Sequence, residues 1–309
     1  MSPQVAYATQ HSNVTPDKFP RIKEAMNSGV PTHYDGGAPP IPRQRGLPYH
    51  PNNAERFQYI DQKLWQDAYA EYRLVLAAET IADSARIAET PTTTVARNPD
   101  RTVSADRRII EDFRRINIYF PTGQCYNVQV PTNADIVRMI TQVQKKCPPL
   151  PVMLTKRDIS SAFRLLKLRP SLSMLMFAEF HGRFFDPKYY VVLYYRSMPF
   201  GWGGSQAFFA TLGDAVTVIH GASGMRRPLW NFRFSFKSRL YVGDGVFVEM
   251  SNRRRQNEST WIWGIITVGF LVPLALNKKK LEEAGQWPTT PIILGLVYGD
   301  ESITEPLHE

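Results

Sequence analysis

Residues 240–248 read Leu-Tyr-Val-Gly-Asp-Gly-Val-Phe-Val, and this stretch decides the fold. An Asp-Gly pair between alternating apolar residues is a strong β-hairpin signal. The pattern predicts that Leu240–Val242 pairs with Val246–Val248 across Gly243-Asp244-Gly245. Asp244 is then expected at the apex of the hairpin.

A second acidic residue ends an earlier predicted strand. Val152–Arg157 is rich in apolar residues and is followed by Asp158. Neighbouring strands of one sheet would bring the carboxylates of Asp158 and Asp244 together, and hard oxygen ligands of this kind suit a two-Mg²⁺ phosphoryl-transfer site. Taken singly, each acid is more often a solvated strand cap or a plain turn residue.

A glycine-rich turn separates the two acids along the chain. It reads Ser-Met-Pro-Phe-Gly-Trp-Gly-Gly-Ser from Ser197 to Ser205, and the spacing predicts a helix over Ser205–His220. Such a backbone approaches a phosphate or a base closely, and a helix N-terminus favours anions. The glycine spacing fits neither a dinucleotide-binding fingerprint nor a P-loop.

The remaining patterns alternate between helix and strand. A helix capped by Asn52 or Asn53 is predicted to bury Phe57, Ile60, Leu64, Ala68, Tyr72 and Val75, and another begins near Thr132 or Asn133 and buries Ile136, Val137, Ile140 and Val143. Strands are predicted at Thr93–Arg97, Arg108–Phe113, Met174–Phe180, Tyr189–Tyr195 and Ile292–Tyr298. This order predicts an α+β fold, one antiparallel sheet with helices on a face.

Composition narrows the function classes. The chain has 309 residues with a net charge of +9, which favours a polyanionic partner. Cys125 and Cys147 form no disulfide framework, so a reducing, intracellular setting is expected, with cytoplasm and nucleus left open. The six scattered histidines do not support zinc. Trp261–Leu276 is uncharged but short for a membrane span, and a buried helix followed by a strand is predicted there.

At this point the chain resembles reverse transcriptases. Asp158–Phe163 looks like the first palm motif of that family, and Met198–Phe209 looks like the second. Tyr241–Gly245 resembles its Tyr-x-Asp-Asp hairpin. Arg107–Asn117 resembles the fingers motif, and Asn277–Glu282 and Ile293–Leu296 resemble the lysine and Leu-Gly motifs. The motifs stand in family order between residues 90 and 298.

The resemblance implies roles for individual residues. Asp158, Asp244 and the Ile159 carbonyl would bind Mg²⁺ or Mn²⁺. The residues expected to contact an incoming dNTP are Arg97, Arg108, Phe163, Phe200, Gly201, Gln206 and Lys280. Arg114, Arg115 and Trp202 are expected to contact the template-primer nucleic acid. For Arg108, Phe163 and the lysine triplet, ordinary solvated or core positions stay open as alternatives.

The resemblance also implies a domain organisation. Residues 1–52 hold nine of the 24 prolines and are expected to form an extended arm. Residues 53–150 would form a fingers-like region, and 151–309 a right-hand polymerase palm with a fingers extension at about 164–197. The chain would stop before a thumb, and self-association through exposed palm surface would follow.

The departures from the family concern the metal site. Gly243 stands where the first Asp of the Tyr-x-Asp-Asp pair is expected, and Gln206 replaces a usual proline. A retroelement polymerase domain, decayed or truncated, with impaired nucleotidyl transfer on an RNA or DNA template is therefore the leading hypothesis. The alternative is a non-catalytic nucleic-acid-binding remnant that grips phosphates with Arg114-Arg115, Arg226-Arg227 and Arg253–Arg255. A third interpretation, a scaffold with solvated basic faces, is also left open.

Overall fold

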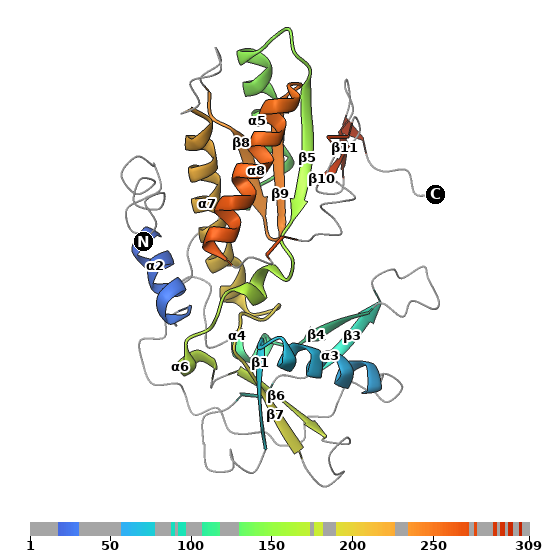
Figure 1. Cartoon of the computed structure of the whole chain (residues 1–309). Helices are drawn as coiled ribbons and strands as arrows, with labels where there is room; N and C mark the ends of the chain where they lie inside the picture. Colours follow the sequence, from blue (N-terminus) through green and yellow to red (C-terminus); the bar gives the residue numbers. More distant parts are fainter. Residues whose placement is uncertain are drawn as a thin grey trace. The chain divides into compact units, whose positions relative to one another are not determined.

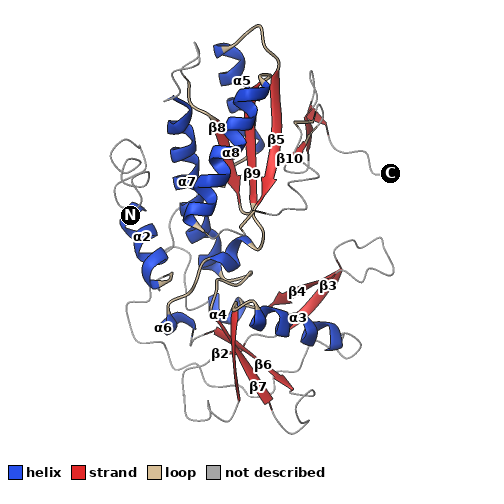
Figure 2. Cartoon of the chain, viewed as in Figure 1, coloured by secondary structure: helices blue, strands red, loops and turns tan. Residues whose placement is uncertain are grey.

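The computed structural model describes residues 18–30, 57–77, 88–89, 92–96, 107–117, 130–173, 176–181, 190–225, 234–271, 275–276, 287–288, 291–293, 296–298 and 303–304. The fold is α+β, with small and mainly antiparallel sheets (Figures 1 and 2). The chain divides into two compact units. The first contains Met1–Lys23, Val128–Leu165 and Phe209–Glu309, and the second Glu24–Asn127 and Leu166–Phe208.

The first unit is built around a three-stranded antiparallel sheet. Its strands are β5 (Val152–Asp158), β9 (Asp244–Met250) and β8 (Lys237–Tyr241), in the order β5-β9-β8. The predicted strand and hairpin are both confirmed. β9 is the central strand, and its residues after Asp244 are all buried.

Helices cover both faces of this sheet, so the expectation of helices on one face was wrong. On one face, α5 (Asn133–Lys146) packs Ile136, Met139 and Val143 into a core with Leu154, Val246, Val248 and Met250. On the other face lie α7 (Gly203–Met225) and α8 (Arg253–Phe270) (Figure 1). The physical reason is that β9 carries apolar residues on both faces of the sheet. Val246 and Val248 pack on the α5 side, and Phe247 packs edge-on against Trp263 of α8 on the other side.

The turn between β8 and β9 differs from the predicted one. Tyr241 pairs with Asp244, so the two turn residues are Val242 and Gly243. Asp244 is therefore the first residue of β9 and does not lie at the apex. Of the two turn residues, Val242 takes the left-handed conformation, with φ of 50°.

The other helical predictions for this part of the chain are largely confirmed. α5 begins after the predicted cap Thr132, although Val137, expected to be buried, is 41% exposed. α7 is longer than predicted. α8 supplies the helix expected at Trp261, but this helix is only partly buried, because Trp261 is 64% and Ile265 43% exposed. Leu276 forms a single bridge with Ile159. Among the described residues, no helix is long and apolar enough to cross a membrane.

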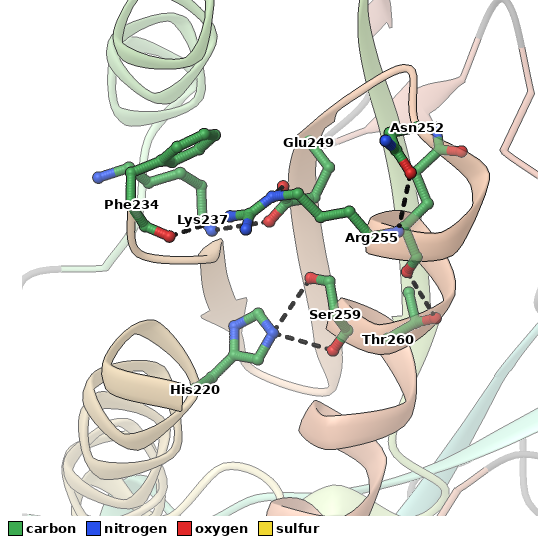
Figure 3. A network of polar contacts seen from close by, with 9 residues as sticks. His220, Phe234, Lys237, Glu249, Asn252, Arg255, Ser259 and Thr260 are labelled. Atoms are coloured by element: carbon green, nitrogen blue, oxygen red, sulfur yellow. Dashed lines mark hydrogen bonds and ion pairs between the residues drawn. The ribbon is translucent and has the colours of Figure 1, made fainter. Parts of the chain in front are cut away.

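A buried polar network ties α7 and α8 to the sheet (Figure 3). Arg255 Nε donates to Glu249 Oε2 at 2.6 Å, and the two side chains are 1% and 0% exposed. His220 Nε2 lies 2.9 Å from the Ser259 carbonyl oxygen, and its Nδ1 lies 2.7 Å from Ser238 Oγ. Because a carbonyl only accepts, Nε2 carries the proton of a neutral imidazole.

The second unit contains two sheets. The larger has the order β1-β7-β6-β2, formed by β1 (Arg73–Ala77), β7 (Tyr190–Tyr195), β6 (Met176–His181) and β2 (Ala88–Glu89), with β2 parallel to β6. The smaller pairs β3 (Thr92–Ala96) with β4 (Arg107–Glu111). The strands predicted at Thr93–Arg97, Arg108–Phe113, Met174–Phe180 and Tyr189–Tyr195 are confirmed with slightly shifted bounds, and they pair as β3 with β4 and β6 with β7.

The first predicted helix is shorter than its pattern. α3 (Phe57–Tyr69) buries Ile60 and Leu64 as expected, but Val75 belongs to β1. Glu71 takes a left-handed φ of 58°, which ends the helical turn. Beyond it, the guanidinium of Arg73 is buried against the carboxylates of Asp67 and Glu111.

Short elements complete the described chain. Within the expected extended arm, the structure has a helix, α2 (Lys18–Ser28), so that expectation was wrong for these residues. Ile22 of α2 is buried, and this burial stabilises the helix. The remaining elements are α4 (Arg114–Asn117), the 3₁₀ helix η4 (Ala162–Leu165), α6 (Pro170–Ser173), β10 (Ile292–Ile293), β11 (Leu296–Tyr298) and β12 (Ile303–Thr304).

Candidate functional site

Asp158 and Asp244 are direct cross-strand partners in the first unit. The register of β5 and β9 places them opposite each other. Residues opposite each other in antiparallel strands point to the same face, with Cβ atoms about 4.5–5.5 Å apart. Both residues are half-buried. The structure therefore brings together the two carboxylates that the sequence singled out.

The chain after Asp158 is fixed to the β8–β9 turn by backbone hydrogen bonds. Ile159 N donates to the Gly243 carbonyl at 2.7 Å, and Ser160 N donates to the Ala275 carbonyl at 2.7 Å. η4 follows, and its Phe163 is 6% exposed and packs edge-on against Phe209 at 5.5 Å. Phe163 is thus a core residue of this unit, and its contact with a sugar stays a prediction.

Gly243 lies beside the same loop. A Cβ added to Gly243 would be 3.3 Å from the Ile159 carbonyl oxygen and 3.5 Å from Ala162 Cβ. The first distance requires a shift of a few tenths of an ångström, and the second is an ordinary contact. A side chain at position 243 therefore fits with a small adjustment and would start next to the two acids.

The donor set suits one hard divalent cation. Two carboxylates on one face of the sheet, with a backbone carbonyl in the adjoining residue, are the oxygen ligands that Mg²⁺ and Mn²⁺ accept. Within the described ranges, no group of three or more His, Cys, Asp or Glu side chains is placed to hold a metal ion. Among these residues, the site therefore has two carboxylates and not the third that a two-metal centre would use.

The glycine-rich turn belongs to the second unit. Phe200 is 53% exposed, Gly201 has φ of 93°, and Gln206 is exposed on the first turns of α7. Trp202 is 4% exposed and stacks on Phe208 with 6.2 Å between ring centroids. This burial does not favour contact of Trp202 with nucleic acid, which stays a prediction.

Asn117 of α4 fastens this turn. Its Nδ2 donates to the Gly201 carbonyl at 2.9 Å, and its Oδ1 accepts from Gly203 N at 2.9 Å. A Cβ on Gly201 would lie 3.1 Å from the Phe113 ring, so glycine is required by both space and conformation. The sequence grouped Asn117 with the fingers motif but assigned it no role.

The other predicted contact residues are either outside the described residues or engaged in other contacts. Arg97, Lys280 and the pair Arg226-Arg227 are outside the described residues, as are the side chains of Arg108 and Arg115, whose backbones lie in β4 and α4. Arg114 is exposed and its guanidinium binds the Asp112 carboxylate. The expectation that Arg255 grips phosphates was wrong, because its side chain is buried against Glu249.

Sequence reasoning missed the cations near the acids. Arg239 and Lys156 both lie opposite Val246, on the face that carries Asp158 and Asp244, and both are exposed. The signal was the alternation Lys237-Ser-Arg239-Leu-Tyr241 in β8. It places every second residue on one face.

No protein-family model matches this chain, and no curated protein matches it.

Proposed function

We propose that this chain is a reverse-transcriptase-like domain with a right-hand palm, carrying a nucleotidyl-transfer site whose metal centre is incomplete. The observation that supports this best is the cross-strand pairing of Asp158 with Asp244. Two further features are consistent with it. Gly243 and Ile159 are hydrogen-bonded beside the acids, and a glycine-rich turn with exposed Phe200 precedes α7.

The proposed reaction joins a dNTP to a primer on an RNA or DNA template. The primer 3′-hydroxyl oxygen attacks the α-phosphorus and a P–O bond forms. The bond to the β-phosphate breaks, pyrophosphate leaves with that electron pair, and the hydroxyl proton passes to solvent. Asp158, Asp244 and the Ile159 carbonyl would hold Mg²⁺ or Mn²⁺, which supplies electrostatic stabilisation of phosphoryl charge when bound.

Gly243 limits this reaction. A missing carboxylate ligand commonly costs several kcal/mol of barrier, about a thousandfold in rate. The proposed activity is therefore weak in the natural chain. Arg97, Arg108, Phe163, Phe200, Gly201, Gln206 and Lys280 are proposed to contact the nucleotide.

The second candidate is a nucleic-acid-binding protein without catalysis. The absence of a three-carboxylate group from the described residues favours it. In this case the basic residues on the face of Asp158 and Asp244 would still contact phosphates. The two candidates share a partner, template-primer nucleic acid, and differ in whether nucleotides are joined.

Calorimetric titration with Mn²⁺ tests the site directly. The full chain is expected to bind one ion, and both Asp158→Asn and Asp244→Asn are expected to weaken binding at least tenfold. Asp214→Asn, which removes an exposed carboxylate on α7 of the same unit, is the control and should change nothing. Unchanged Mn²⁺ affinity in both site variants would reject the assignment.

Primer extension separates the two candidates. With Mn²⁺ and a template-primer, weak extension that Asp158→Asn abolishes supports the enzyme. No extension by either the natural chain or Gly243→Asp, together with retained nucleic-acid binding, supports the non-catalytic candidate.

A further inference from the structure

Cations lie on the two outer strands of the sheet, on the face that carries the two acids and that α5 covers at Val246 and Val248. Asp158, Asp244 and Tyr241 form one row across β5, β9 and β8. The next row is Lys156, Val246 and Arg239. The row after that has Lys237 opposite Val248. Successive rows are about 7 Å apart, because two residues of a strand separate them.

The end of α5 extends this arrangement. Lys146, in its last turn, is close enough to Lys237 to oppose its positive charge, as is Arg239. Burial is the main cause that lowers the pKa of Lys237, followed by the charges of Arg239, Lys146 and Arg255, while Glu249 opposes them. Arg239, Lys237 and Lys146, here called the β8 cation line, therefore form a run of like charge along one edge of the sheet.

Acidic residues do not neutralise this run. Glu249 is near Lys237, but its carboxylate is bound to Arg255. Asp135, the acid close to Arg239, already binds Arg138 and the Thr132 cap. Within the described part of the chain, the ammonium groups of Lys146 and Lys237 form no ion pair. Like charges held together in this way destabilise the protein unless an anion binds them.

We propose that the β8 cation line binds successive phosphates of a nucleic-acid strand whose end lies at the Asp158–Asp244 pair. This inference rests on the proposed function and deepens it, because it names the strand contact of that site. The cations are spaced along an extended strand and do not converge on one point. A chain of phosphates matches that spacing, whereas a single triphosphate would need a convergent pocket.

The test is the affinity of a fluorescently labelled single-stranded DNA of 20 nucleotides, measured by anisotropy at several salt concentrations. The natural chain is expected to bind at low salt. Lys237→Gln/Arg239→Gln should weaken binding at least tenfold and reduce the salt slope by about 1.4, since each single-strand phosphate contact contributes about 0.7.

The matched control is Lys167→Gln/Arg196→Gln, which removes the same charge from two exposed residues of the second unit. It should weaken binding less than threefold. Equal losses in both double variants would mean that net charge alone matters, and would overturn the proposal. Lys237→Arg/Arg239→Lys keeps the charges and should retain binding, which excludes misfolding as the cause.

The outcomes separate this inference from the proposed function. If Mn²⁺ binds at the acids but the cation-line variant retains full DNA affinity, the cation line is rejected and the site stands. If the cation-line variant loses dNTP binding but not DNA binding, the strand assignment is rejected. If the natural chain does not bind DNA at low salt, the inference is rejected as well. If the natural chain also fails to bind Mn²⁺, the proposed function is rejected with it.

Discussion

In the turn between β8 and β9, the left-handed backbone belongs to Val242, with φ of 50°, and not to the glycine that follows it. A β-branched residue in that region costs about 1–3 kcal/mol. Glycine adopts it without strain but loses about 0.5–1 kcal/mol through unfolded-state entropy. We therefore expect Val242→Gly to raise the free energy of unfolding by about 1 kcal/mol, measured in urea. Val246→Gly, at a buried strand position, is the control and should lower it.

Gly243→Asp is expected to make stability depend on divalent metal. Its backbone is not left-handed, so a side chain adds no backbone strain. Three neighbouring carboxylates repel one another until a cation binds, and Mg²⁺ at a hundred times its Kd would add about 2.7 kcal/mol. Thermal unfolding with Mg²⁺, against NaCl of equal ionic strength, measures this. Gly243→Asn lacks the charge, and an equal response from both variants would contradict the prediction.

The hairpin could be predicted from the sequence, but its turn could not. Asp-Gly is a strong turn signal, and it suggested a turn of Gly243-Asp244-Gly245 with Asp244 at the apex. The structure uses Gly245 for packing, because a Cβ there would lie 2.6 Å from Trp263 Cζ2. Because Trp263 belongs to α8, which follows β9 in the chain, the residues next to Gly245 in the sequence do not indicate this contact. The proximity of Asp158 and Asp244 could nevertheless be anticipated, because each acid was predicted at the end of a strand.

Burial of charge was the least predictable feature. Arg253, Arg254 and Arg255 look alike in the sequence, yet the first two are exposed and Arg255 is buried. The difference arises because Arg255 faces Glu249 and the Phe234 carbonyl, which come from separate segments. Likewise, the helical spacing through Val75 gave no sign that Arg73 would enter a sheet beside Glu111. The spacing of apolar residues indicates which face of a helix or strand is buried, whereas the partner of a buried charge depends on tertiary packing.

Arg255→Met is expected to destabilise the first unit by about 3–5 kcal/mol, because it leaves the Glu249 carboxylate buried without its cation. Replacing both partners, Glu249→Leu/Arg255→Met, should cost less than the single change, since no charge is then buried. Chemical denaturation measures both. Arg254→Met removes an ion pair between a 62% exposed Arg254 side chain and a 19% exposed Glu258 side chain, and it should cost less than Arg255→Met. A double variant as unstable as the sum of its single changes would contradict this account.

His220 and Glu249 should give opposing pH dependences. Burial lowers the pKa of His220 from 6.5 to about 3, so its contribution is present above pH 6.5 and declines as the pH falls towards 3. Burial raises the pKa of Glu249 from 4.5 to about 7, so its contribution is present below pH 4.5 and declines as the pH rises to 7.

Between pH 4.5 and 6.5 these two effects nearly cancel. In Glu249→Gln, only the histidine effect remains, and the free energy of unfolding should fall by about 1.4 kcal/mol per unit as the pH decreases, relative to the natural chain. His220→Gln should show the opposite slope over the same range. Urea titrations at half-unit steps measure both, and parallel curves for the two variants would refute the assignment.

Asn117 should control the order of the glycine-rich turn. Asn117→Ala removes both hydrogen bonds, to the Gly201 carbonyl and from Gly203 N, and is expected to cost about 1–3 kcal/mol. Asn117→Asp can still accept from Gly203 N but cannot donate to Gly201, so its loss should be smaller. If the turn contacts nucleotide, dNTP affinity should follow the order natural, Asp, Ala, measured by calorimetry below the unfolding transition. Affinity that is equal in all three proteins would show that the clamp serves stability alone.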